Sequence, residues 1–237
     1  MENEFLKFFF GYVEGKARTK AILAIEICAK IEQMIENQPC PVVSLDRIYA
    51  PRTDYTIEAT RVTDPVTKES TIGPRQNCPS IYDQIGFIDT RGPIAVADCG
   101  AFDGGTIEKI CEMLEKRSIA IDCVYLGVCG RRAKERLSAR WNLKCAYTME
   151  LYEWIELRDA FLIDGRAACA PDRKRWFIPY SENLQNWASI PSGREEEAAK
   201  LCETYNRRLI ELLSETNPID QILASIGQRI RLRGDRR

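Results

Sequence analysis

The stretch that most constrains the fold is Ile94 to Val128, where two apolar runs flank a helical pattern. Ile94–Ala97 and Ile119–Val128 are rich in apolar residues, and Thr106–Arg117 between them repeats its apolar residues at helical spacing. Apolar runs of this length are typical of strands that are covered on both faces. The stretch therefore predicts a strand–helix–strand unit, in which the two strands lie parallel.

The same alternation extends toward the N-terminus. We expect a strand at Phe5–Tyr12, a helix over Ala17–Asn37 and another strand at Val42–Tyr49. Thr56–Ile72 has two polar, β-branched arms around a turn, which predicts a hairpin outside the centre of the sheet. The predicted fold class is therefore α/β, with a mostly parallel twisted sheet and helices on both faces.

Composition excludes several classes of function. The 237 residues include 34 basic and 35 acidic side chains and no histidine. This balance argues against nucleic acid as a partner, and no apolar run approaches the ~20 residues that span a bilayer. Without histidine, any chemistry must use carboxylates, Lys or Arg, backbone amides, or a metal held by oxygen. Ten cysteines without a C-x-x-C pair argue against zinc, and we expect reduced thiols in a cytoplasmic protein.

The junction "IAVADCGAFDGGT" holds the residues with the clearest potential for binding. Gly104, Gly105 and Thr106 open a predicted helix, whose first amides are unpaired and suit an anion. In the alternative interpretation Asp103 caps the helix and the glycines only make the turn. Asp98 ends a buried strand, where a carboxylate needs a partner, so we expect it to be functional.

Two turns at strand ends, a polar hairpin between them, and an acid before Gly-Gly-Thr resemble the type I phosphoribosyltransferase family. The resemblance covers roughly Phe5 to Leu126 and rests on "IAVADCGAFDGGT" and "FFFGYVEGKARTKAILAIEI". It implies binding of phosphoribosyl pyrophosphate or a nucleotide. It also implies transfer of phosphoribose to or from a nitrogen base, with pyrophosphate as the other product or substrate and Mg²⁺ as the cofactor.

The resemblance also implies roles for particular residues. Asp98 is the expected catalytic residue, because the acids of this motif hold the ribose hydroxyls. The 5-phosphate is expected at Asp103, Gly104, Gly105 and Thr106, and the pyrophosphate at Glu14, Gly15 and Lys16. Lys16 is alternatively a solvated lysine in the first turn of a helix. The hairpin around Thr60–Thr71 takes the place of the family's mobile active-site loop, and the metal ligands stay unassigned.

Two positions depart from the family's motif. Cys99 stands where the motif has its second acid, and Asp103 stands where a threonine is usual. Cys99 is either a packing residue or a reactive thiol. Whether the protein is an enzyme therefore stays open. The alternative is a non-catalytic phosphoribosyltransferase-like sensor or assembly subunit that acts through its C-terminal helices.

The C-terminal half divides into two predicted parts. The phosphoribosyltransferase-like domain is expected to cover residues 1–192, with a hood-like segment at about 147–191. Trp154, Phe161 and Trp176 are candidates for stacking on a base, although an aromatic core is the alternative. Residues 193–237 are expected to form a helical extension with a basic tail, beginning with a helix over Arg194–Glu215. We expect its apolar stripe to bind a second copy or a partner subunit.

Overall fold

The computed structural model describes residues 22, 24–46, 49–63, 70–75, 78–150, 166–169, 175–178 and 193–216. These residues belong to two compact units. The larger unit is drawn from Ala21–Val62 and Ser70–Tyr152 and contains the sheet predicted from the sequence.

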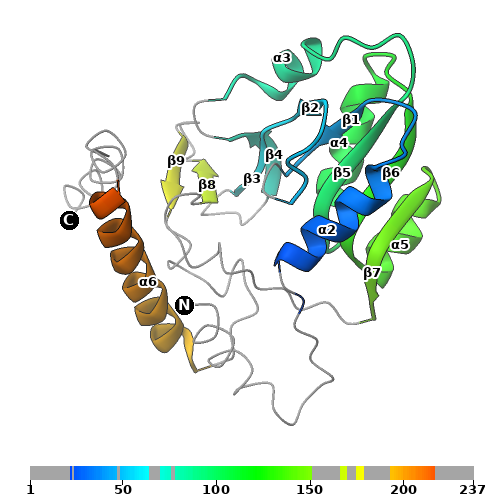
Figure 1. The fold of residues 1–237 in the computed structure, drawn as a ribbon. Helices are drawn as coiled ribbons and strands as arrows, with labels where there is room; N and C mark the ends of the chain where they lie inside the picture. Colours follow the sequence, from blue (N-terminus) through cyan, green and yellow to red (C-terminus); the bar gives the residue numbers. More distant parts are fainter. Residues whose placement is uncertain are drawn as a thin grey trace. The chain divides into compact units, whose positions relative to one another are not determined.

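A five-stranded sheet forms the centre of the larger unit (Figure 1). Its strand order is β2-β1-β5-β6-β7, and each neighbouring pair is parallel. The strands are β1 (Val42–Ser44), β2 (Tyr55–Thr56), β5 (Ile94–Ala101), β6 (Ile121–Gly130) and β7 (Leu143–Met149). Parallel strands leave their carboxyl ends at one edge of the sheet, which is where ligands bind in sheets of this kind.

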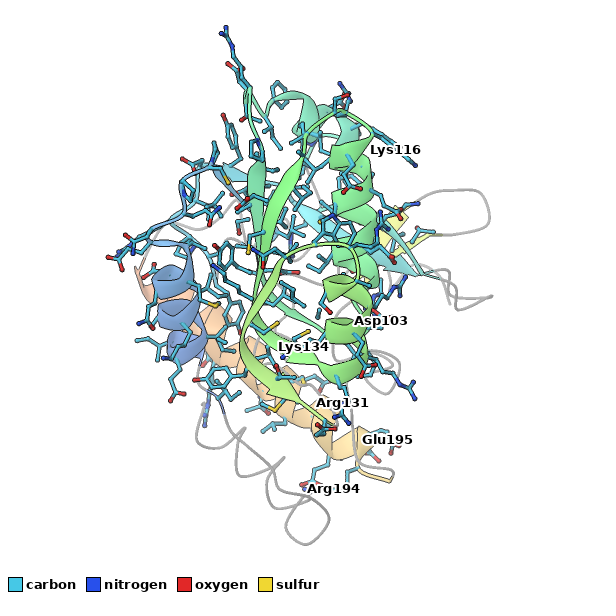
Figure 2. The ribbon with its side chains drawn as sticks, turned by 90° about the vertical axis from the view of Figure 1, so that its right-hand side faces the viewer. Asp103, Lys116, Arg131, Lys134, Arg194 and Glu195 are labelled. Atoms are coloured by element: carbon cyan, nitrogen blue, oxygen red, sulfur yellow. The ribbon has the colours of Figure 1, made fainter. Side chains whose placement is uncertain are left out.

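Helices cover both faces of this sheet, as the view in Figure 2 makes plain. The helices of the larger unit are α2 (Ala24–Ile35), α3 (Ile81–Gly86), α4 (Gly105–Glu115) and α5 (Arg131–Ser138). α4 and α5 lie on one face and share a buried apolar core with the sheet, built from Val96, Leu126, Ile110, Leu114 and Leu137. α2 lies on the other face (Figure 2), where Ile27 and Ile31 pack against the β6 glycine, Gly127.

The remaining elements are short strands and one long helix. β3 (Ala59–Thr63) and β4 (Ser70–Pro74) are neighbours in a second sheet. In the smaller unit, β8 (Arg166–Cys169) pairs antiparallel with β9 (Arg175–Ile178), and α6 spans Glu195–Thr216. Within the described part of the chain, no helix has the length and apolar character needed to cross a bilayer.

The predicted fold class is confirmed, because the sheet is parallel and helices lie on both of its faces. The strand predicted at Val42–Tyr49 is wrong beyond Ser44, because the chain turns there and the Ala50 amide donates to the Asp46 carbonyl at 2.9 Å. In the larger unit, α3 and β7 were not predicted. The strand predicted at Phe5–Tyr12 lies outside the described residues.

Candidate functional site

Two buried carboxylates come together at the carboxyl edge of the sheet. Asp46 follows β1, and Asp98 lies in the second half of the neighbouring strand β5. The amide of Leu45 donates to the carbonyl of Ala97 at 2.8 Å, which fixes the end of β1 against β5. Both side chains are buried, with 3% of Asp46 and 8% of Asp98 exposed.

Cys99 completes this group, which we call the strand-end cluster (Asp46, Asp98 and Cys99). One ligand atom from each residue lies within 4.8 Å of the other two, and Cys99 is only 7% exposed. Carboxylate oxygens suit Mg²⁺, whereas a thiolate is the ligand of softer metals. The two carboxylates therefore fit a magnesium ion, and the thiol does not.

Backbone amides orient the carboxylates of the cluster. The amide of Cys99 donates to Oδ1 of Asp98 at 2.8 Å, and the amide of Tyr49 donates to Oδ1 of Asp46 at 3.4 Å. The amide of Asp46 itself donates to Oγ of Ser44 at 3.0 Å. The first two bonds hold each carboxylate against backbone close to it in the chain.

Gly127 allows α2 to approach β6 closely, next to the part of β5 that carries Cys99. A β-carbon at Gly127 would lie against Cγ2 of Ile27 and 2.6 Å from the carbonyl oxygen of Cys99. Real β-carbons do not approach other atoms so closely, and a backbone carbonyl cannot rotate out of the way. The packing of α2 on β6, beside the Cys99 carbonyl, therefore requires a residue without a side chain at position 127.

The Gly-Gly turn lies directly after β5. Phe102, Asp103 and Gly104 connect β5 to α4, and Gly104 adopts φ +82°, a conformation that favours glycine. Oδ1 of Asp103 accepts a hydrogen bond from the Gly105 amide at 3.0 Å. Figure 2 labels Asp103 at this end of α4. One of the amides expected to bind a phosphate is thus already bonded to a carboxylate of the same chain.

Helix α5 packs against the outside of this turn. A β-carbon at Gly104 would lie 3.1 Å from Cγ of Leu137, so Leu137 sits directly against the turn. Nη1 of Arg136 donates to the carbonyl oxygen of Asp103 at 3.5 Å, and Nη2 of the same residue pairs with Glu108 of α4. Two residues of α5 therefore hold the turn and the first turns of α4 in place.

Two thiols near this edge have shifted pKa values. A hydrogen bond from Cys145 lowers the pKa of Cys129, at the end of β6, and the charge of Lys134 acts in the same direction. Burial raises the pKa of Cys28 in α2, and the charges of Glu32 and Asp46 add to this shift. Cys99 forms no disulfide, and neither does any other cysteine whose side chain the structure describes.

Several predicted site residues cannot be placed. Glu14, Gly15 and Lys16 lie outside the described residues, as do Trp154 and Phe161. The backbone of Trp176 is described in β9, but its side chain is not. The pyrophosphate and base-stacking assignments therefore stay predictions.

Asp46 is the one member of the cluster that the sequence did not single out. Its signal was nonetheless present, because it follows the mostly apolar stretch Val-Val-Ser-Leu at 42–45, much as Asp98 follows Ile94–Ala97. The same rule, an acid directly after the apolar run of a buried strand, would have found both.

Comparison with known proteins gives only structural likenesses. No family model matches the chain, and no curated protein matches it. Orotate phosphoribosyltransferase of Mycobacterium tuberculosis, in complex with inorganic phosphate, is similar with 10% identity and a TM-score of 0.33 over 53% of this chain and 70% of that one. Adenine phosphoribosyltransferase of Thermoanaerobacter pseudethanolicus is similar with 9% identity and a TM-score of 0.36, over 53% of this chain and 82% of that one. A protein of Thermus thermophilus is similar with 15% identity and a TM-score of 0.39, over 55% of this chain and 86% of that one.

The orotate and adenine enzymes are type I phosphoribosyltransferases. The fold class of this chain rests on the strand order and the parallel register of its sheet. The orotate and adenine enzymes thus belong to the family that the sequence resembles.

Proposed function

We propose that this chain is a phosphoribosyltransferase-like protein that binds phosphoribosyl pyrophosphate or a nucleotide at the carboxyl edge of its parallel sheet. The observation that carries the proposal is the placement of Asp98 and the Gly104–Thr106 turn on one strand–helix unit, β5–α4. A carboxylate for hydroxyl groups and helix amides for a phosphate then lie within a few residues of each other.

Each part of the site has a role in this proposal. Asp98 holds the ribose hydroxyls, and the amides from Asp103 to Thr106 receive the 5-phosphate. Asp46 and Asp98 would supply oxygen ligands for Mg²⁺, and the bound ion would neutralise charge on the pyrophosphate. Glu14, Gly15 and Lys16 remain the proposed pyrophosphate residues, and Trp154, Phe161 and Trp176 the proposed base-stacking residues.

Transfer of phosphoribose needs little acid–base chemistry from the protein. The reaction passes through a ribose with oxocarbenium character, so positioning and charge stabilisation contribute most of the rate. A chain without histidine can therefore supply what the reaction requires. In this proposal the residues from 194 onward bind a second copy or a partner subunit.

The second candidate is a non-catalytic relative that binds the same ligand as a sensor or assembly subunit. It is favoured by Cys99, a thiol where the motif has an acid, and by the bond between Asp103 and the Gly105 amide. Both features weaken the contacts that catalysis needs while leaving the fold intact.

Titration with phosphoribosyl pyrophosphate and Mg²⁺, followed by melting temperature, tests both candidates. Either one requires that the ligand raise the melting temperature, since it binds only the folded state. Absence of any shift removes both.

Asp98→Asn separates enzyme from binder. If the protein releases pyrophosphate with a purine, pyrimidine or nicotinate-type base, we expect this variant to lose about a hundredfold in rate and to melt near the wild-type temperature. Asp89→Asn, an exposed position before β5, is the matched control and should keep the rate. Binding without pyrophosphate release from any base identifies the non-catalytic relative.

A further inference from the structure

Asp103 places a negative charge at the start of α4. Its Oδ1 accepts from the Gly105 amide at 3.0 Å, and Gly105 is the first residue of the helix. The first amides of a helix have no partner within the helix and carry its positive dipole end, so they attract anions. In this chain the anion at the Gly105 amide is a side chain two residues away.

The surroundings of the turn keep this carboxylate where it is. Gly104 has φ +82° and packs against Leu137, which leaves the turn little freedom to change shape. The nearby cation, Arg136, is already paired with Glu108 and bonded to the Asp103 carbonyl. The positive charge of Arg136 is therefore largely balanced by Glu108. It does not remove the repulsion between the Asp103 carboxylate and an incoming anion.

The geometry points to Asp103 as a residue that sets the specificity of this turn by competing with phosphate. A phosphate that uses the Gly105 amide must displace the carboxylate and tolerate its charge a few ångströms away. The inference rests on the proposed function, since it concerns the same turn. A ligand of the phosphate would strengthen its binding, whereas the Asp103 carboxylate weakens it. The turn then binds anions weakly in the wild-type chain, and loss of one charge strengthens it.

Asp103→Asn tests this inference, because asparagine keeps the shape and an acceptor for the Gly105 amide but removes the charge. Calorimetry with phosphoribosyl pyrophosphate and Mg²⁺, and separately with inorganic phosphate, gives the affinities. We expect the variant to bind both anions roughly five- to tenfold more tightly than wild type, as for removal of one like charge near a solvated site. Asp89→Asn removes a charge of the same sign before the amino end of β5, whereas Asp103 follows its carboxyl end, and it should bind like wild type.

Each other outcome is decisive. Equal binding by wild type and Asp103→Asn overturns the inference and leaves the proposed function standing. Weaker binding by Asp103→Asn makes the carboxylate a ligand and overturns the inference as well. Equal tightening in Asp89→Asn assigns the effect to net charge and also overturns it. Absence of binding by all three proteins overturns the inference together with the proposed function.

Discussion

β5 and β6 are neighbours in the sheet, and each runs into a helix at its carboxyl end, yet the two junctions are built differently. Between β5 and α4 stand three residues, of which Gly104 has φ +82°. β6 passes directly into α5, and its last residue, Gly130, has an ordinary extended conformation with φ −68°. The first junction needs glycine for its backbone, whereas the second does not.

The two junctions also differ in charge. The first is acidic, with Asp98 in the strand, Asp103 bonded to the Gly105 amide and Glu108 in the first turn of the helix. The second has no acid in its first turn and begins with Arg131, which pairs with Glu135 and Glu150. Equivalent places in one topology can therefore be specialised in opposite ways, and only the first combines a strand-end acid with a glycine turn.

Leu137 connects the two junctions, because it belongs to α5 and packs on Gly104. Its side chain is fully buried, so Leu137→Ala should lower the free energy of unfolding by about 3 kcal/mol. Urea denaturation measures this change. A loss below about 1 kcal/mol, on the order of an exposed substitution, would show that the turn does not depend on α5.

Replacement of the two junction glycines compares their backbones directly. Gly104→Ala should cost about 1–2 kcal/mol, because alanine is strained at positive φ. Gly130→Ala should cost less, since its φ is one that alanine adopts freely. In a double-mutant cycle, Leu137→Ala should relieve part of the Gly104→Ala cost by opening the 3.1 Å contact. Equal losses of stability at positions 104 and 130 would show that the positive φ of Gly104 creates no special need for glycine.

The smallest expected effect tests which junction receives the anion. Thr106→Val removes a hydroxyl from the first turn of α4 and should weaken binding of phosphoribosyl pyrophosphate by about 1 kcal/mol, a roughly fivefold loss. Arg132→Gln, in the first turn of α5, is the matched variant at the other junction and should bind like wild type. The reverse result would move the anion to the second junction.

The parallel sheet could be predicted because its inner strands are almost wholly buried. Each residue of β5 before Gly100 is buried, so the strand reads as an unbroken apolar run up to Asp98. β7 was missed because it is an edge strand with most side chains half-buried, which leaves no clear alternation. α3 was missed because six residues give too little periodicity, although Ser80 caps it by accepting from the Asp83 amide.

The candidate site was predictable only in its local parts. Asp98 and the turn that follows it are contiguous in the sequence, so one motif reveals both. The approach of Asp46 to Asp98 depends on the pairing of β1 with β5, which brings together residues 52 positions apart. The direction of the Asp103 side chain was left open by the sequence, because a cap and a phosphate turn use the same residues.

The glycine at position 127 joins the position of a helix to that of a carboxylate. The side chain of Ile27 in α2 and the carbonyl oxygen of Cys99 both lie beside Gly127, in the space that a β-carbon there would need. The amide of Cys99 in turn holds Oδ1 of Asp98. A shift of α2 toward the sheet would therefore displace Gly127 of β6, the strand that pairs with β5 at Asp98. A larger side chain at Ile27 should therefore change the orientation of the Asp98 carboxylate.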